Sequence, residues 1–246
     1  MTRKACLVIG AGDATGGAIA KRFAREGFET VVVRRERHID DLNALAEEMN
    51  SAGGSAHAFG VDARDEEQMV DLFAKIEKDI APLGVAVFNI GGNVNFPITE
   101  TTGRVYRKVW EMSCFAGFLT GREAAKVMIP RGEGTILFTG ATASIRGGVG
   151  FSAFAGAKHG LRALAQSLAR ELGPKGIHVA HTIIDGAIDT AFISERFPER
   201  YKLKEQDGIL QPADIAENYW HLHCQPRNSW TFEMDLRPWM ENIANA

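Results

Sequence analysis

Residues 6–27 of the chain read CLVIGAGDATGGAIAKRFAREG, and this stretch decides the fold. A short apolar run passes through a glycine-rich turn into a segment with apolar residues at helical spacing, which closes at Gly27. Glycines in such a turn let the backbone approach a pyrophosphate, which the free N–H groups at the helix start then bind. The stretch predicts a strand, a turn and a helix that bind a dinucleotide. The alternative is a tight turn without a ligand.

The same alternation of apolar runs and helical patterns continues along the chain. Further strands are expected at 29–35, 55–62, 85–92, 134–140 and 177–185, with a last one within 228–239. Helices are expected at 39–54, 65–79, 102–128, 151–173 and 212–224. Such alternation gives right-handed βαβ units. We predict an α/β protein with one Rossmann-like, doubly wound parallel sheet of about seven strands, helices on both faces, and a single domain over 1–246.

Composition narrows the class of partner and compartment. The formal net charge is −3, so no basic field favours nucleic acid. The cysteines Cys6, Cys114 and Cys224 are scattered and odd in number, which favours a reducing compartment. No apolar run is long enough to span a membrane. The apolar start leads directly into the glycine turn, so we interpret it as a buried first strand rather than a signal peptide and expect a cytoplasmic protein.

The end of the second strand selects the sugar of the dinucleotide. An acidic residue there binds a ribose 2′-hydroxyl, whereas an arginine accommodates a 2′-phosphate. Arg34 and Arg35 stand at this point and favour NADP. Asp13 in the glycine turn opposes a nearby phosphate, and Glu36 would reach the ribose if the strand ended later. NAD therefore stays as the alternative.

Several motifs occur in an order that resembles the short-chain dehydrogenase/reductase superfamily over nearly the whole chain. GAGDATGGAIA (10–20) resembles the glycine motif TGxxxGxG, with Gly10 and Gly16 kept and Ala14 at the middle glycine. VDARD (61–65) places Asp62 where the family binds the adenine amino group. VFNIGGN (87–93) resembles the NNAG segment. DGAIDT (185–190) resembles PGxxxT, with Asp185 at the proline position and Thr190 placed to meet the nicotinamide amide.

The resemblance implies hydride transfer between a nicotinamide cofactor and a small-molecule substrate. It also implies a homodimer or homotetramer formed through the helices at 102–128 and 151–173. Together with the two arginines, the residues expected to bind the cofactor are Gly10, Gly12, Asp13, Thr15, Gly16, Arg34, Arg35, Asp62, Ala63, Asn89, Gly91, Lys158, Ile188 and Thr190.

The catalytic positions of the family are substituted in this chain. The family uses a tyrosine four residues before a lysine as proton donor or acceptor, a serine thirteen residues earlier to hold the substrate oxygen, and an asparagine on the fourth helix to support a water relay. Lys158 fits the lysine, but the tyrosine, serine and asparagine positions hold Phe154, Ala141 and Cys114. Loss of a general acid typically costs about 10²–10⁴ in rate. We expect these three residues to line an altered, apolar site.

Other polar residues are candidates to replace the missing groups. Thr142 follows Ala141, and Asp185 ends the sixth strand, where it would reach the nicotinamide rim. The alternatives are that the Thr142 hydroxyl serves local backbone groups and that Asp185 caps a loop or helix. Cys114 would be a nucleophile or, more simply, a packing residue. The run HLHC (221–224) does not complete a ligand set, so we expect no metal site. The polar and aromatic segment 187–207 is either a lid or a surface excursion.

Two functions follow. The first is an NAD(P)-dependent oxidoreductase with an altered catalytic site, because the cofactor supplies the hydride chemistry and the protein supplies orientation and electrostatics. The second is a dinucleotide-binding protein without turnover, acting as a sensor or as the inactive partner in an oligomer. The cofactor residues are retained better than the catalytic ones, which favours the second, whereas the family is mostly made of enzymes, which favours the first.

Overall fold

A parallel sheet of seven strands forms the centre of the molecule, described here from a computed structural model that covers residues 3–241. The strands follow the order β3-β2-β1-β4-β5-β6-β7, and every neighbouring pair is parallel. Their bounds are β1 Ala5–Ile9, β2 Glu29–Arg34, β3 Ser55–Gly60, β4 Leu83–Phe88, β5 Gly134–Thr139, β6 Ile177–Ile184 and β7 Glu233–Leu236. The predicted Rossmann-like fold is confirmed.

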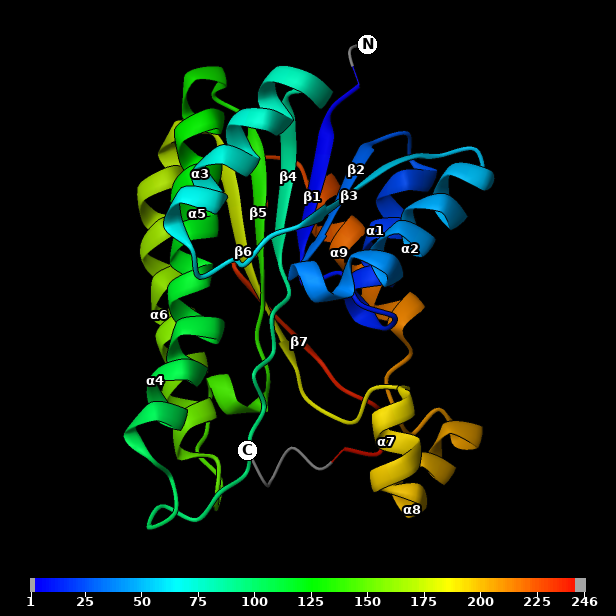
Figure 1. The fold of residues 1–246 in the computed structure, drawn as a ribbon, viewed down its shortest axis with the longest axis vertical. Coiled ribbons are helices and arrows are strands. Elements are labelled where there is room, and N and C mark those ends of the chain that lie inside the picture. Colours follow the sequence, from blue (N-terminus) through cyan, green and yellow to red (C-terminus); the bar gives the residue numbers. More distant parts are fainter. Residues whose placement is uncertain (1–2, 242–246) are drawn as a thin grey trace.

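Helices cover both faces of the sheet, as Figure 1 shows. One layer contains α1 (Thr15–Arg25), α2 (Ile39–Ser51) and α9 (Pro212–Cys224), and its apolar side chains form one core with the sheet. The other contains α3 (Glu66–Lys75), α5 (Ala116–Met128) and α6 (Ser152–Leu172), which form a second core on the opposite face. The five inner strands are buried on both sides, which explains their nearly continuous apolar runs, whereas the edge strands β3 and β7 are mostly half-buried.

The helix expected over 102–128 is interrupted. It begins as α4 (Gly103–Trp110), passes through a π-helical turn at Glu111–Phe115 and continues as α5. The Thr102 side chain caps its start by accepting a hydrogen bond from the Val105 amide. Such π turns are rare and often lie near functional sites. This turn carries Cys114 and thereby sets the direction of its side chain.

Residues 187–207, for which no regular pattern was expected, are mostly helical. They fold into α7 (Ala191–Arg196), α8 (Pro198–Tyr201) and a short 3₁₀ segment, Lys202–Gln206. The Thr190 side chain caps α7 by accepting a hydrogen bond from the Ile193 amide. These helices are too short to show an apolar period, which is why the sequence pattern did not reveal them.

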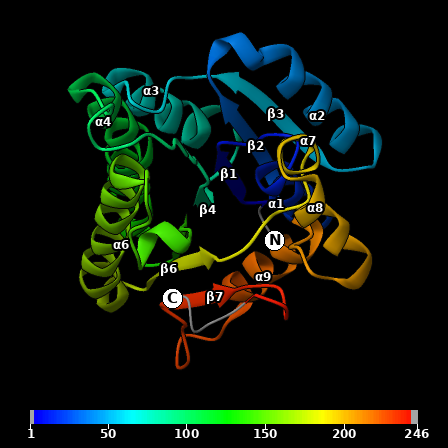
Figure 2. The same cartoon turned by 90° about the horizontal axis from the view of Figure 1, so that it is seen from below.

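The carboxyl ends of the strands meet at one edge of the sheet, seen from below in Figure 2. The strand order reverses between β1 and β4, and ligands of open α/β sheets bind outside the carboxyl ends at this point. In Figure 2, α7 and α8 lie on one side of this edge, and α4 and α6 lie on the other. Between residues 3 and 241 the structure has no helix both long and apolar enough to cross a membrane.

Candidate functional site

The glycine turn after β1 is closed tightly by backbone contacts. Gly10 has a φ of +91°, a conformation that favours glycine. A methyl group on Gly16 would lie 2.3 Å from the Gly10 carbonyl oxygen, so only glycine fits there. The Asn89 side-chain amide donates a hydrogen bond to the same oxygen at 3.1 Å. The turn is thereby fixed at the start of α1, where the free N–H groups of the helix face a ligand.

A cavity of about 850 Å³ lies at the carboxyl ends of the strands, beside this turn. Most residues expected to bind the cofactor line it: Gly10, Gly12, Asp13, Thr15, Gly16, Asn89, Gly91, Lys158, Ile188 and Thr190. The others, Arg34, Arg35, Asp62 and Ala63, line an adjoining hollow of about 250 Å³ that shares Gly10, Gly12, Asn89 and Gly91 with the cavity. The two spaces therefore form a continuous path from the end of β2 to Lys158.

This path fits an extended dinucleotide. A methyl group at Gly91 would meet nothing within 4 Å, so the backbone there borders open space. A methyl group at Gly12 would have only the Arg34 guanidinium within 4 Å. The helix N-terminus would bind the pyrophosphate of a dinucleotide. The open backbone and the adjoining hollow leave room for its two nucleoside ends.

Positive charge gathers at the sugar-selecting end of the path. Burial and the neighbouring Arg37 and Arg64 guanidinium groups lower the pKa of Arg35. Arg34 has a long ion pair of 3.8 Å with Asp41. Glu36, which would have favoured an unphosphorylated ribose, instead folds its carboxyl group against Gly60 at the end of β3.

Asp62 is already engaged by an internal partner that the sequence did not reveal. The Arg64 guanidinium binds both carboxylate oxygens, with Nε 2.9 Å from Oδ1, and lowers the pKa of Asp62. An adenine amino group placed at Asp62 would therefore share this carboxylate with Arg64.

Lys158 reaches the cavity from α6 although its side chain is only 1% exposed. Its ammonium group donates hydrogen bonds to the carbonyl oxygens of Thr139 at 2.8 Å and Ile90 at 3.0 Å. These bonds use two of the three ammonium hydrogens and leave one for a ligand hydroxyl. Burial without an adjacent carboxylate lowers the pKa of Lys158 to about 7.

Phe154 and its neighbours form an apolar wall beside Lys158. Phe154 is buried and packs in a cluster with Ala143, Ala141 and Phe151. The Lys158 ammonium lies 5.9 Å from the centre of the Phe154 ring. Phe154 and Ala141 both line the cavity. They stand where the family pattern has the tyrosine and serine hydroxyl groups, so this part of the cavity surface is apolar in this chain.

Cys114 does not line the cavity, contrary to the expectation for the asparagine position. The π turn directs its side chain toward α6, where a methyl group on Gly160 would lie 2.9 Å from Sγ. Burial raises the pKa of the thiol, although the Lys158 charge opposes this. Cys114 therefore serves as a packing residue behind Lys158.

Thr142 and Asp185 come together on the cavity wall from the ends of β5 and β6. The Thr142 hydroxyl donates a hydrogen bond of 2.5 Å to Asp185 Oδ1. Asp185 is 2% exposed, and its other oxygen lies 3.7 Å from the Arg237 guanidinium. Thr142 thus does not serve local backbone groups, and Asp185 is not a cap. The sequence did not reveal Arg237, because it comes from the segment after β7.

Two other hydroxyls near the cavity, those of Thr139 and Ser144, have internal partners. Thr139 bonds the buried Tyr219 hydroxyl at 2.6 Å, and Ser144 accepts a hydrogen bond from the Ala141 amide at 3.1 Å. His181 is a fully buried core residue whose Nδ1 lies 3.0 Å from Glu233, and burial lowers its pKa to about 4. Within residues 3–241 no three metal-ligating side chains come together. Thr142 and Asp185 are thus a hydrogen-bonded polar pair on the cavity wall.

The chain matches known proteins along most of its length. The family model described as short chain dehydrogenase matches residues 4–200. The 3-oxoacyl-[acyl-carrier-protein] reductase of Mus musculus is 28% identical over 199 residues, 81% of each chain. A short-chain dehydrogenase from Rhodopseudomonas palustris is 50% identical, with a TM-score of 0.81 over 96% of this chain and 99% of that one. Actinorhodin polyketide ketoreductase, solved with NADPH, has a TM-score of 0.85 at 23% identity and covers 96% of each chain.

The family model covers well over half of the chain, and the fold and the glycine turn agree with it. The likeness to the ketoreductase shows the fold alone. On the match at residues 4–200, this chain belongs to the short-chain dehydrogenase family.

Proposed function

We propose that the protein is an NAD(P)-dependent oxidoreductase that transfers hydride to or from a small organic substrate through an altered catalytic site. The observation that supports this most is the contact between Thr142 and Asp185 on the cavity wall. It places a hydrogen-bonded carboxylate and hydroxyl in the cavity that also contains Lys158 and the glycine turn. A site that only bound a dinucleotide would have no need of this buried polar pair.

A bound nicotinamide supplies the hydride acceptor or donor. The glycine turn and the start of α1 would hold the pyrophosphate, and Lys158 would hold ribose hydroxyls with its remaining ammonium hydrogen. Ile188 and Thr190 border the same cavity and would contact the nicotinamide end. The apolar wall of Phe154 and Ala141 would keep water from the reacting carbon.

The pair Thr142 and Asp185 is arranged to accept a proton. The Thr142 hydroxyl directs its hydrogen to Asp185, which leaves its oxygen lone pairs for a substrate alcohol. In the oxidation of an alcohol, the substrate proton passes to the Thr142 oxygen while the Thr142 proton passes to the Asp185 carboxylate. The hydride leaves the carbinol carbon and a carbonyl forms. In the reduction of a carbonyl the same proton path runs in reverse.

NADP is the cofactor that we propose, because Arg34 at the end of β2 and Arg35 after it line the hollow, and Glu36 turns away from it. The test is to titrate NADPH and NADH and to follow the cofactor fluorescence. We expect the wild type to bind NADPH more tightly than NADH, and Arg34→Glu to weaken NADPH far more than NADH. Equal losses for both cofactors would contradict the choice of NADP, and failure to bind either would contradict the proposed function.

The second candidate, a dinucleotide-binding protein without turnover, is favoured by one observation, the apolar wall at the tyrosine and serine positions. It predicts cofactor binding but no reaction of NADPH with carbonyl or enone substrates. The rate of NADPH oxidation with such substrates separates it from the first candidate.

We also propose that residues 187–207 form a lid. This segment contributes Phe192, Ile193 and Phe197 to the cavity lining, and Phe192 and Phe197 are more than half exposed. A ligand that covers exposed aromatic side chains at a cavity mouth removes their apolar surface from water, which stabilises the bound state.

The three free cysteines are consistent with a reducing compartment such as the cytoplasm.

A further inference from the structure

Arg146 is a positively charged residue of the cavity wall whose guanidinium pairs with no acidic group among residues 3–241. It lies between the 3₁₀ turn Thr142–Ser144 and α6, lines the cavity and is half-buried. Among residues 3–241 its guanidinium has neither an ion pair nor a side-chain hydrogen bond, and only its backbone amide is bonded, to the Thr142 carbonyl.

Four other charged residues that line the cavity, apart from Asp13 in the glycine turn, are already bound. Arg200 pairs with Glu241. Asp185 accepts the Thr142 hydroxyl and faces Arg237, and Lys158 binds two carbonyl oxygens. Arg146 thus differs from its neighbours in keeping its full hydrogen-bonding capacity for a ligand.

The cavity that Arg146 lines also has apolar side chains and open space on its wall. Phe151 and Phe154 line the same cavity, and Phe192 and Phe197 reach it from α7 and the residue before α8. A methyl group on Gly147, the next residue, would meet nothing within 4 Å. The cavity therefore has open space at the residue next to Arg146 and apolar surface for the body of a ligand.

We propose that Arg146 binds the carboxylate of a substrate whose remaining body is apolar. The planar guanidinium matches a carboxylate with two parallel hydrogen bonds, and it gains most where water is excluded. A phosphate dianion is a poorer match, because Arg146 is a single cation and the Asp185 carboxylate lines the same cavity. This inference rests on the proposed function, since it names the class of compound that the oxidoreductase site takes.

The test uses octanoate and octanamide, which share an apolar chain and differ in charge. Their dissociation constants are measured by calorimetry, first with the protein alone and then with the protein saturated with NADPH. The wild type is expected to bind octanoate at least about tenfold more tightly than octanamide, the effect of a charge-assisted hydrogen-bonded pair. Arg146→Met should abolish this preference, and Arg146→Lys should retain part of it.

Arg170→Met is the matched control, because Arg170 also has no acidic partner among residues 3–241 but lies on the exposed side of α6. It should keep the preference for octanoate. NADPH affinity should be equal in the wild type and in Arg146→Met. Equal binding of octanoate and octanamide by the wild type, or a preference that survives in Arg146→Met, would overturn the inference. Failure of NADPH to bind would instead contradict the proposed function, and the titrations without cofactor would still decide the role of Arg146.

Discussion

Single side chains decide what the site can do. Gly16 lacks the methyl group that would collide with the Gly10 carbonyl, so the turn and the start of α1 come close enough to face a pyrophosphate. Phe154 lacks the hydroxyl that a tyrosine would place beside Lys158, and this removes a proton donor without removing the lysine. The sequence predicted both, because each depends on residue type at a known spacing. It could not reveal that Thr142 donates to Asp185, because forty-two residues separate them and only the sheet brings them together.

Lys158 should make cofactor binding dependent on pH. Its pKa in the unliganded protein is about 7, so it is protonated below this value and neutral above it. The protonated form attracts the anionic cofactor, and NADPH affinity should therefore fall as the pH rises from 7 to 9, by roughly tenfold or more. Fluorescence titrations at a series of pH values measure this. In Lys158→Met the affinity should be lower and nearly independent of pH over that range. The same pH dependence in the variant as in the wild type would remove Lys158 from the cofactor site.

The strands and helices position the residues of the site at and beyond their ends. β1, β4, β5 and β6 each end in a loop that lines the cavity, and α6 supplies Lys158 from one side. Strong alternation of apolar runs and helices made these long elements predictable from the sequence. The short α7 and α8 and the π turn at Glu111–Phe115 were not predictable, because tertiary contacts rather than a local apolar period fix them. The position of the Cys114 side chain was therefore not predicted either, since the π turn directs it to Gly160 and away from the cavity.

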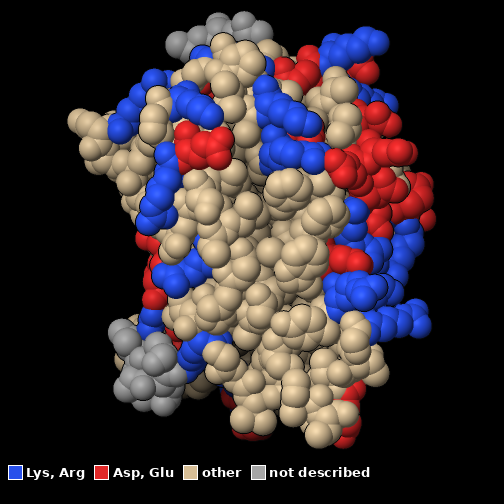
Figure 3. Space-filling view, turned by 90° about the vertical axis from the view of Figure 1, so that its left-hand side faces the viewer, with Lys and Arg blue, Asp and Glu red and all other residues tan. Residues whose placement is uncertain are grey.

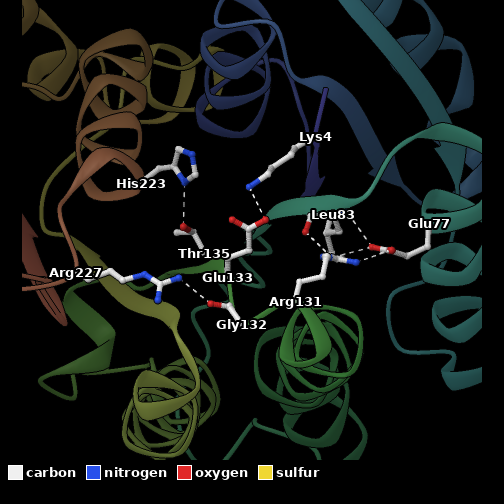
Figure 4. A network of polar contacts seen from close by, with 9 residues as sticks. All are labelled: Lys4, Glu77, Leu83, Arg131, Gly132, Glu133, Thr135, His223 and Arg227. Carbon is white, nitrogen blue, oxygen red and sulfur yellow. Dashed lines mark hydrogen bonds and ion pairs between the residues drawn. The ribbon is translucent and has the colours of Figure 1, made fainter. Parts of the chain in front are cut away.

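The opposite ends of the strands are held together by a polar network, shown in Figure 4. Arg131, after α5, binds Glu77 with Nη1 at 2.7 Å and Nη2 at 3.1 Å, and it also donates to the Leu83 carbonyl. Glu77 in turn accepts the Leu83 amide at 2.8 Å. These contacts join the end of α5 to the segment before β4.

Arg131→Met should lower the free energy of unfolding by about 1–3 kcal/mol, because it leaves the half-buried Glu77 without its main partner. Chemical denaturation measures this loss. Lys175→Met, which breaks an exposed pair with Glu171, is the control and should cost less than about 0.5 kcal/mol. NADPH affinity should be unchanged in both variants, since the network lies at the edge of the sheet away from the cavity. A loss in Arg131→Met no greater than in Lys175→Met would show that the network is not stabilising.

The whole molecule presents one large uncharged face. Figure 3 shows it on the side of the α3, α5 and α6 layer, with charged side chains mainly at its edges. Trp110, Phe115 and Phe118 stack in series with ring centres 6.0 Å apart, and Trp110 and Phe118 are exposed. The aromatic residues near the C-terminus either pack on their own domain or stay exposed. Trp220 packs against Phe23 and Trp230 against His178, whereas Trp239 is exposed.

We propose that this uncharged face joins copies of the chain into a homodimer or homotetramer, because exposed apolar patches of this kind mark contact surfaces. Phe118→Glu should shift the oligomer toward monomer at micromolar concentration, as measured by sedimentation velocity. Phe197→Glu is the control, an equally drastic change of an exposed phenylalanine in the proposed lid, and it should leave the oligomer intact. A monomeric wild type, or an oligomer insensitive to Phe118→Glu, would contradict the proposal.

The most direct test of the central claim is the steady-state rate of NADPH oxidation with a panel of carbonyl and enone substrates. It compares the wild type with Thr142→Val, Thr142→Ser, Asp185→Asn and the double variant Phe154→Tyr/Ala141→Ser. The proton path through Thr142 and Asp185 predicts activity in the wild type, a loss of about 10²-fold or more in Thr142→Val and Asp185→Asn, and substantial activity in Thr142→Ser. An inactive wild type that gains activity only as the double variant would contradict the claim and favour a dinucleotide-binding protein without turnover.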